Sequence, residues 1–541
     1  PDLTRNDKAK QELSGGPIHY DLSGAETYDT ILSVQIAPSD PRVLWVGSDD
    51  GVVSVTRDGG KSWKTVTPSG APAWARVYQI DVSATDPGTA YLAFDAHELN
   101  DDKPYVYATS DYGRSWRRIG AGLPTNASVI VVRADPSDPS VLAAGTMTGL
   151  WISRDRGHDW TQLKANLPTM PIFDLKFVRG DLVLASHGRG LWVLDHFAPV
   201  AELDPHAVPA HLALFTPGIG IEYQRWNRGE GAEPSFVTPN APSGVMIDYS
   251  LPKKLKADAQ QKALHQTPLK IEVRDSKGRL IATRYGKSRE GVNRFVWDMR
   301  FDGPTAIDFG KPAVQGKEPS WERGPRGPMV LPGAYTISVT AGGRTESAQA
   351  RVEPDPNQPP ALQAQTETLR MALESRAQAD AMNRMLNRIS AMQAELAAYR
   401  KSVAEQAMGI DESQHADAEA QATLAAHAKT LSAELGKLKD SIYNPKVQHK
   451  VAEDDLHELT DLHGAVTTNA EIFAELGTQA PTDALLSIEK EVAGELGAKL
   501  ADYNALLAGD VASYNQAAFN AGAPTIAAGK PIRIAAPPSV D

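Results

Sequence analysis

Two pairs of adjacent aspartates are the first candidates for chemistry in this sequence. Asp49-Asp50 precedes Gly51, and Asp101-Asp102 precedes Lys103. Cleavage of a glycosidic bond needs two carboxyl groups, one protonated as general acid and one ionised as base or nucleophile. The same residues also fit a simpler role, because Asp-Asp-Gly is an ordinary tight-turn sequence and a paired aspartate can staple a loop. Both interpretations stay open at this point.

A second set of side chains could hold a ligand beside these carboxylates. It combines aromatic rings, which stack on sugars and apolar groups, with charged groups that fix orientation. The ligand-binding candidates are Glu26, Tyr28, Asp29, Trp74, His97, Lys103, His187 and Arg189. For the last two residues the alternative is a glycine-flanked turn whose arginine pairs with a neighbouring sheet.

The sequence excludes several other classes of site. It contains no cysteine, so disulfides, thiolate metal sites and cysteine nucleophiles are absent. The histidines lack metal-ligand spacing such as His-Glu-x-x-His, and there is no Gly-x-Ser-x-Gly elbow or phosphate-binding loop. We therefore expect no metal and no cofactor. The net charge of −12 argues against a nucleic-acid partner, and no apolar run is long enough to span a bilayer.

A repeated frame, Ser/Thr-x-Asp-x-Gly-x-x-Trp, must position these residues. Its three copies place the Asp, Gly and Trp at Asp58, Gly60, Trp63; Asp111, Gly113, Trp116; and Asp155, Gly157, Trp160. The Asp can accept backbone N–H bonds, the Gly can take a positive φ, and the Trp can fill the seam between neighbouring sheets. The aspartates are 111 − 58 = 53 and 155 − 111 = 44 positions apart, close to the roughly 40–50 residues of one propeller blade.

Alternating apolar residues around each copy predict four consecutive β-sheet units within residues 1–198. The expected strands are 31–36, 43–47, 52–55 and 64–67; 77–82, 90–94 and 105–108 after a long polar loop; 128–133, 141–145 and 150–153; and 172–178, 182–185 and 191–194. The fourth unit has no copy of the frame. Because the frames follow the third strand of each unit, the turns between second and third strands should lie at the opposite face, with the candidate residues.

The frame resembles the Asp-box (BNR) repeat of sialidase-like, sortilin-like and xyloglucanase-like β-propellers. Residues 1–196 also resemble the C-terminal propeller of large two-propeller bacterial proteins often labelled glycosyl hydrolase or sortilin-like. That similarity is carried by residues 1–8 (PDLTRNDK), 45–51 (WVGSDDG), 101–105 (DDKPY) and 187–195 (HGRGLWVLD). The resemblance implies a β-propeller in an exported, periplasmic or secreted bacterial protein.

Propellers of this kind usually have six or more blades, so four units predict an incomplete ring. An open arc would leave a strand edge at each end, which folded proteins avoid. We therefore expect the remaining blades to come from a missing N-terminal half or from a second chain.

The remaining sequence predicts two further kinds of domain. Residues 199–356 are expected to form a β-sandwich with strands 245–251, 269–274, 293–299 and 334–339 and a Pro/Gly-rich insertion. The segments 295–298 (FVWD) and 331–336 (LPGAYT) resemble the Ig-like domain of flagellar hook-capping proteins. Residues 357–520 show helical apolar spacing and predict an antiparallel bundle or long hairpins, and 521–541 an extended tail.

Two functions follow from these observations. In the first, the propeller binds a peptide or polymer on the face opposite the Asp boxes, and the helices form a partner-binding or self-association arm. In the second, the protein is a glycoside hydrolase whose carboxylate pair is partly supplied by the absent half. Binding is favoured because no catalytic pair stands out and a helical arm has no obvious use in a glycosidase.

Overall fold

The structure is a computed structural model that describes residues 1–10, 28–204, 206–207, 209–223, 242–263, 266–307, 326–358, 362–406, 415–444, 461–477, 479–538 and 540. The chain divides into two compact units. The first comprises Pro1–Gly218, Pro239–Ala241 and Asp248–Pro252, and the second Ile219–Thr238, Pro242–Ile247 and Lys253–Asp541. The candidate Glu26 lies outside the described residues.

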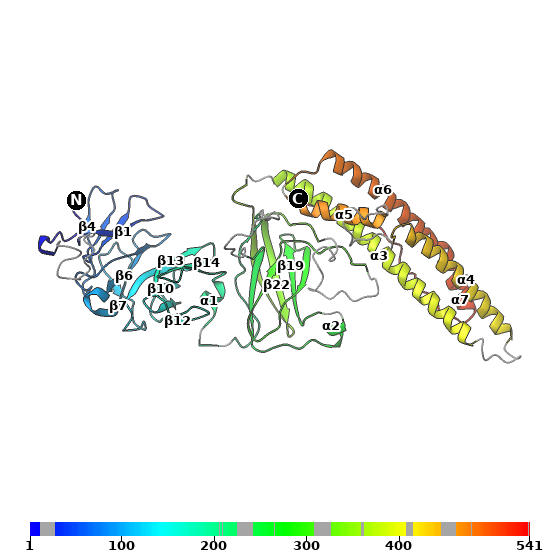
Figure 1. The fold of residues 1–541 in the computed structure, drawn as a ribbon, viewed down its shortest axis with the longest axis horizontal. Helices are drawn as coiled ribbons and strands as arrows, with labels where there is room; N and C mark the ends of the chain where they lie inside the picture. The colour runs from blue at the N-terminus through cyan, green and yellow to red at the C-terminus, as the bar shows by residue number, and fades with distance from the viewer. Residues whose placement is uncertain are drawn as a thin grey trace. The chain divides into compact units, whose positions relative to one another are not determined.

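The first unit contains four antiparallel sheets in which each strand pairs with the next one along the chain (Figure 1). The first sheet consists of β1 (Ile31–Ile36), β2 (Leu44–Ser48), β3 (Val53–Thr56) and β4 (Lys64–Thr65). The second consists of β5 (Ile80–Val82), β6 (Ala90–Ala96), β7 (Asp101–Thr109) and β8 (Arg117–Arg118). The third consists of β9 (Val129–Ala134), β10 (Leu142–Thr146), β11 (Gly149–Ser153) and β12 (Thr161–Leu163). The fourth sheet holds three strands in the described residues: β13 (Ile172–Val178), β14 (Asp181–Ser186) and β15 (Leu191–Leu194).

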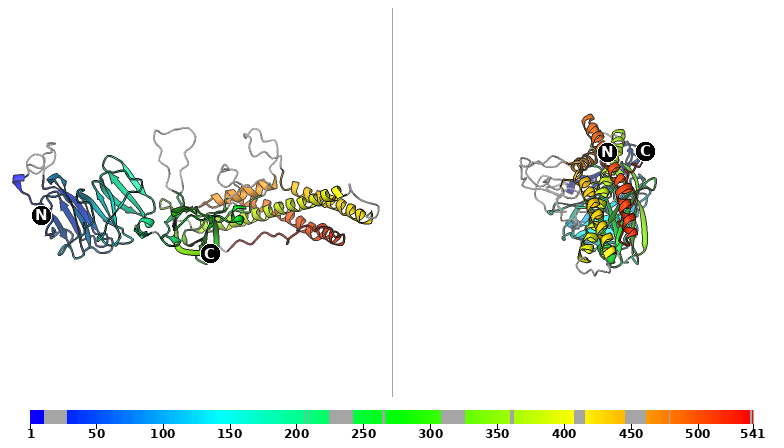
Figure 2. Two further views of the ribbon diagram at one scale, coloured as in Figure 1. Left: turned by 90° about the horizontal axis from the view of Figure 1, so that it is seen from below. Right: turned by 90° about the vertical axis from the view of Figure 1, so that its right-hand side faces the viewer.

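Three apolar cores join consecutive sheets. The first combines side chains such as Trp45 of β2 with Ile80 and Leu92 of the second sheet. The second unites the second and third sheets, and the third unites the third and fourth sheets. Consecutive four-stranded sheets packed face to face are the propeller-like arrangement that the repeat predicts, and they stand side by side in the left view of Figure 2.

Each copy of the repeated frame, which we call an Asp box after its aspartate, folds as its residue types predict. Asp58 accepts hydrogen bonds from the Thr56 hydroxyl at 2.8 Å, the Ser62 amide at 2.9 Å and the Ser62 hydroxyl at 2.6 Å. The bond from the Ser62 hydroxyl, followed by that from its amide, lowers the pKa of Asp58 to about 2. Asp111 is held in the same way by Thr109 and Ser115, so these carboxylates close their own turns.

The box tryptophans donate a hydrogen bond to the preceding sheet only where such a sheet exists. The indole of Trp116 donates to Val66 O at 2.7 Å, and that of Trp160 donates to Ile119 O at 2.8 Å. Both acceptors follow the outermost strand of the preceding sheet. Trp63, in the first sheet, donates instead to Gly60 O of its own box at 3.1 Å. The second and third tryptophans therefore lie at seams, as the sequence predicts, whereas no sheet precedes Trp63 among the described residues.

Replacing Gly157 by Ala should destabilise the first unit more than the same change at Gly60. Both glycines have positive φ, +83° and +91°, which costs an L-residue roughly 1–2 kcal/mol. A Cβ on Gly157 would also lie 2.8 Å from Ile119 Cβ, whereas one on Gly60 meets nothing closer than 3.9 Å. Overpacking should add roughly 1–3 kcal/mol for Gly157→Ala alone. Urea titrations of the two variants measure the difference, and equal losses would contradict the packing at the seam.

The first part of the second unit is built from β-strands that form sheets of their own. The strand β18 (Val245–Leu251) is shared by the two units, and its residues from Asp248 onward belong to the first. A five-stranded sheet has the order β17 (Gly220–Ile221), β23 (Arg344–Glu353), β22 (Gly333–Ala341), β19 (Leu269–Asp275) and β20 (Leu280–Tyr285). Trp297 of β21 (Gly291–Trp297) contacts Tyr335 of β22 edge to face at 5.2 Å, so two sheets meet there.

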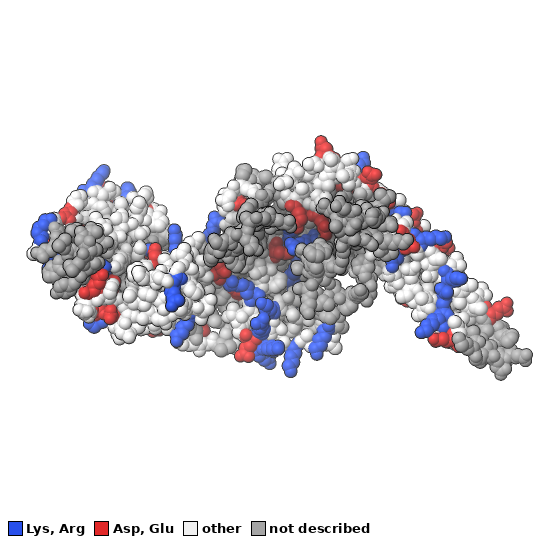
Figure 3. All heavy atoms as spheres, in the orientation of Figure 1, with Lys and Arg blue, Asp and Glu red and all other residues white. Residues whose placement is uncertain are grey.

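Long helices follow, as the apolar spacing predicts. They are α3 (Leu362–Gln406), α4 (His415–Asp440), α5 (Leu462–Glu475), α6 (Asp483–Leu506) and α7 (Ala512–Asn520), with a π-helical turn at Leu507–Val511. The stripe Met382, Met385, Ile389, Met392 and Leu396 of α3 is fully buried, so the methionines fill the core. Acidic and basic side chains are interspersed over the helices on the face that Figure 3 shows. None of the helices in the described part of the chain is both long and apolar enough to span a membrane.

Glu489→Gln should stabilise the helices at neutral pH. Glu489 of α6 is 9% exposed and accepts hydrogen bonds from Gln378, at 2.8 Å, and Asn469, at 3.0 Å. Burial raises its pKa, so the stability present below its unfolded pKa is lost as pH rises through the folded value. A neutral amide avoids that loss, because it brings no charge into the buried site.

We expect a gain of roughly 1 kcal/mol at pH 8 that disappears near pH 4. Urea titrations monitored by far-UV circular dichroism at both pH values measure it. The exposed Glu491→Gln on the same helix is the control. A loss of stability at pH 8 for Glu489→Gln alone would contradict the burial argument.

Candidate ligand-binding face

Most of the candidate residues gather at one face of the first unit, which we call the loop face. Hairpins alternate between the two ends of an antiparallel sheet, so the turns after β2, β6 and β14 emerge opposite the Asp boxes, which follow β3, β7 and β11. The loop face consists of these turns and the links that enter β1, β5 and β13. This agrees with the placement expected from the strand order.

Asp49 and Asp50 are buried at the turn after β2, 7% and 0% exposed. Asp49 accepts a hydrogen bond from the Thr30 amide at 2.8 Å. Asp50 accepts bonds from the Ser48 hydroxyl and the Arg5 amide, and its carbonyl accepts from Arg5 Nε at 2.9 Å. Burial, with the neighbouring Asp50 charge, raises the pKa of Asp49 to about 6. The pair therefore ties the chain's first residues and the start of β1 to this turn.

Tyr28 and Trp74 form a second contact of the loop face. The Tyr28 hydroxyl donates to Trp74 O at 2.6 Å, and the two rings lie 5.8 Å apart. Lys10 Nζ lies 4.1 Å and Arg5 Cζ 5.1 Å from the centroid of the Trp74 ring. These cations cover the indole ring of Trp74. The ring therefore contacts the first residues of the chain and is not open to stack on a sugar. Asp29, which follows Tyr28, has a φ of +71°.

The residues expected on a long polar loop lie on strand β7 instead. Because β7 begins at Asp101, the connection from β6 contains only His97 to Asn100. Asp101 accepts a bond from the Tyr105 hydroxyl at 2.6 Å and pairs with Lys103 at 3.2 Å, and the bond from Tyr105 is the first cause of its lowered pKa. Asp102 is exposed. The long-loop prediction is wrong because Asp101 already pairs with Ala96, so β7 begins there, with an irregular register before Tyr105 pairs with Phe94.

Arg76 organises the part of the loop face that sequence reasoning missed. Its guanidinium donates to the Tyr78 hydroxyl at 2.9 Å and to Glu98 at 2.6 Å. A backbone bridge between Arg76 and Asp95 fixes its position. His97 Nδ1 lies 2.7 Å from Asp95 Oδ2, and this hydrogen bond raises the pKa of His97. The result is a half-buried set of alternating positive and negative groups.

A row of rings extends this set across to the fourth sheet. Tyr78 lies 6.3 Å from Phe173 of β13, and Phe173 lies 5.1 Å from the exposed His187 of the β14–β15 turn, measured between ring centroids. We name Arg76, Tyr78, His97, Glu98, Phe173 and His187 the loop-face cluster. Arg189 is exposed in the same turn as His187. Phe173 and Tyr78 could not be singled out from sequence, because their partners are distant in the chain.

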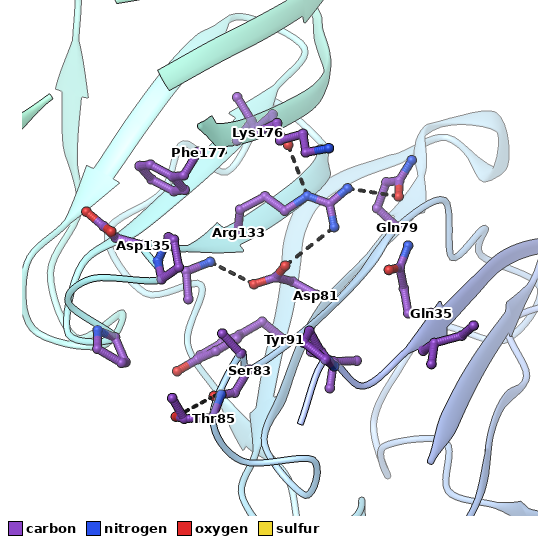
Figure 4. A pocket seen from close by; sticks show the side chains of 18 of the residues that line it. Gln35, Gln79, Asp81, Ser83, Thr85, Tyr91, Arg133, Asp135, Lys176 and Phe177 are labelled. Carbon is purple, nitrogen blue, oxygen red and sulfur yellow. Dashed lines mark hydrogen bonds and ion pairs between the residues drawn. The ribbon is translucent and has the colours of Figure 1, made fainter. Parts of the chain in front are cut away.

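A cavity of about 430 Å³ lies near the other end of the innermost strands, and none of the sequence-predicted site residues lines it. Arg133 of β9 crosses it and donates to Gln79 Oε1 at 3.1 Å, Asp174 Oδ1 at 2.9 Å and Leu175 O at 3.1 Å. Figure 4 shows the Arg133 side chain extended toward Gln79 and Asp81. A single arginine in the apolar strand Val129–Ala134 was the available signal. The donors of Arg133, which lies in the third sheet, bond to acceptors of the second and fourth sheets, so this arginine joins three sheets.

Acidic and imidazole groups do not converge into a metal site. Within the ranges that the structure describes, no group of three or more His, Asp or Glu side chains could hold a metal ion. The chemistry that the loop-face cluster offers is therefore ring stacking, hydrogen bonding and charge pairing.

Comparison with known proteins finds likeness at the level of solved structures. No family model and no curated protein matches the chain. A structure described as YCF48 bound to D1 peptide is 19% identical with a TM-score of 0.25, over 30% of this chain and 51% of that chain. A GH74 enzyme of Niastella koreensis is 15% identical with a TM-score of 0.25, over 42% and 29%. The GH74 xyloglucanase from Xanthomonas campestris is 19% identical with a TM-score of 0.20, over 30% and 36%.

The chain thus spans about half or less of the length of these structures. They are β-propeller proteins. At these TM-scores they do not decide between a binding and a hydrolytic function for this chain.

Proposed function

We propose that the first unit binds a peptide or polymer on the loop face and does not cleave it. The observation that carries this proposal is that the candidate catalytic carboxylates are bonded to other groups of the protein. Asp49 and Asp50 are buried in bonds to the backbone and to Arg5, and Asp101 is held by Tyr105 and Lys103. A hydrolase needs its acid and base free to face the substrate.

The accessible chemistry of the loop face suits binding. Phe173 and His187 give a surface of two adjacent rings, and Arg76 with Glu98 gives charged groups of both signs at its edge. Extended peptides are recognised by such combinations of a ring platform and a few fixed polar groups. We therefore favour a peptide segment with an apolar side chain as the ligand. Export to the periplasm or the exterior stays part of this proposal.

Glycoside hydrolysis is the second candidate, favoured by one observation. The pKa of Asp49 is raised to about 6 beside Asp50, and two neighbouring carboxyl groups with separated pKa values are what acid–base cleavage requires. If the protein is a hydrolase, its substrate must displace the segment around Arg5 to reach the two carboxyl groups.

Arrays of peptides and of glycans, probed with the intact protein, test the proposal. We expect capture on peptides, with Phe173→Ala and His187→Ala each lowering the affinity about tenfold by calorimetry. His158→Ala is the matched control, because His158 is an exposed histidine of the third Asp box, at the opposite face. Glycan turnover that is lost in Asp49→Asn and kept in Asp102→Asn would contradict binding and support hydrolysis.

We also propose that further blade-type sheets cover both ends of the four-sheet arc. Leu32, Val34 and Ile36 of β1 are 38%, 54% and 57% exposed, and Leu191 and Val193 of β15 are 75% and 57% exposed. In both strands these residues alternate with residues that face the neighbouring sheet, and in the fourth sheet β15 has no outer partner strand in the described residues. The exposed rows continue the pattern that the three inner seams bury.

Native mass spectrometry of the protein isolated from its source tests this proposal. We expect these residues together with additional polypeptide, either continuous with them or as a second chain. A folded, monomeric species of this polypeptide alone, with Leu191 and Val193 open to hydroxyl-radical labelling, would contradict it.

A further inference from the structure

The segment after α7 lies extended along the helices, and we call residues 523–533 the strap. At Ala521 and Gly522 the chain reverses direction, with the Ala523 amide donating to Ala518 O at 2.8 Å. The strap then runs back along α7 and α6. Ile526 and Ile532 are 5% and 2% exposed and belong to the helical core.

Two asparagines bind the strap through its backbone. Asn515 of α7 donates to Ile526 O at 3.1 Å and accepts from the Ile526 amide at 2.8 Å. Asn504 of α6 does the same for Ile532, at 2.9 and 3.0 Å. A side-chain amide that pairs with both the N–H and the C=O of one residue recognises an extended backbone. It does not depend on which side chain that residue carries.

Contacts from α3 complete the groove. Glu395 accepts from the Ala527 amide at 2.9 Å, and Arg388 donates to Lys530 O at 2.5 Å. Gly529 has a φ of +65°, and a Cβ there would lie 2.7 Å from Arg388 Cζ. We call the surface formed by Arg388, Glu395, Asn504 and Asn515 the strap groove. The side chains between the two isoleucines contribute little, since Ala527, Gly529, Lys530 and Pro531 are exposed.

We propose that the strap groove is a binding site for extended peptide segments that carry two aliphatic side chains six residues apart, and that the strap is its displaceable occupant in cis. Ile526 and Ile532 are the strap's buried side chains, so little apolar burial opposes the entropy gained when the strap opens. When it opens, it exposes two apolar pockets and two backbone-reading asparagines that any chain of the same pattern can occupy. The inference is independent of the function proposed for the first unit.

A labelled peptide of residues 523–534 tests the proposal against the full-length protein. Ile526→Ser with Ile532→Ser weakens the strap in cis, and Ile534→Ser, an exposed isoleucine of the same segment, is the matched control. By fluorescence anisotropy the peptide should bind the double variant at least tenfold more tightly than the parent or the control. Adding Asn515→Ala to the double variant should remove that gain, whereas Asn520→Ala, exposed at the end of α7, should keep it.

Equal affinity of the peptide for the parent and the double variant, or binding to neither, would overturn the proposal. Hydrogen exchange of the unmodified protein gives a second and independent test. The amides of Ile526 and Ile532 should exchange at least a hundredfold faster than those of Met385 and Leu386 in the buried part of α3. Exchange as slow as that of α3 would show a fixed strap and would also overturn the proposal, even if the double variant does not fold.

Discussion

Replacing His196 by Ala is expected to lower the free energy of unfolding of the first unit by about 3–5 kcal/mol. Nδ1 of His196 lies 2.7 Å from Asp248 Oδ2, and Nε2 donates to Thr216 O at 2.7 Å. The two side chains are 4% and 1% exposed. The substitution leaves the Asp248 carboxylate buried without this partner, and a buried charge that loses its partner is among the most destabilising changes in a protein.

Urea titration followed by hydrogen exchange of the β13 and β14 amides measures this loss. His206→Ala is the control, because the His206 side chain is exposed and its backbone amide, which the substitution keeps, donates to Asp204. The double variant His196→Leu with Asp248→Leu should recover much of the stability, since it removes both buried polar side chains together. A loss below about 1 kcal/mol for His196→Ala would contradict the buried pair.

Arg133→Leu should have an effect of similar size at the centre of the sheets, about 3–5 kcal/mol. The side chain is 15% exposed and joins Gln79 of the segment before β5 to Asp174 and Leu175 of β13. Burial raises the pKa of Asp81 nearby, and Arg133 opposes that rise. Without the arginine, Asp81 ionises at a greater cost, so the loss should be larger at pH 8 than at pH 5.

The same titrations at both pH values check this prediction. Arg133→Lys should be intermediate, because lysine keeps the charge but cannot reproduce the fork of donors. Arg42→Leu is the contrasting control: its ion pair with Asp40 is exposed and should contribute less than about 1 kcal/mol. A loss for Arg133→Leu no larger than that for Arg42→Leu would show that Arg133 does not join the sheets.

Local sequence patterns predicted most of the first unit. The bounds expected for residues 31–36, 172–178 and 191–194 coincide with β1, β13 and β15. Apolar and polar residues alternate in 31–36 and 172–178, 191–194 is a short apolar run, and turn residues follow all three, so neighbouring residues alone were enough to predict these strands. The Asp boxes could be predicted for the same reason, since each carboxylate bonds within its own turn.

Strands stabilised by distant partners were harder to predict. The strand β23 reads Arg-Thr-Glu-Ser-Ala-Gln over its first six residues and shows no apolar alternation there. Its place is set by pairing with β22 on one side and β17 on the other. The strand β20 was missed as well, because only Ile281 and Ala282 of its six residues are buried.

The candidate site could be predicted in its location but only partly in its residues. Strand order alone places the turns with His97 and His187 at one face. The carboxylates of Asp49 and Asp50, in the turn after β2, accept hydrogen bonds from backbone amides that are distant in the chain, so the local sequence does not show these partners. Tyr78 and Phe173 meet through a contact between two sheets, and Arg76 pairs with Glu98, which is distant in the chain; no local pattern identifies such residues.

Hydrogen exchange of the first unit with and without a captured ligand tests the central claim most directly. Ligand binding should slow exchange in the segments around residues 76–78, 97–100 and 187–190, while the box segments around Asp58, Asp111 and Asp155 stay unchanged. Protection confined to the boxes or to the cavity around Arg133 would place the ligand at the other end of the sheets and contradict the account.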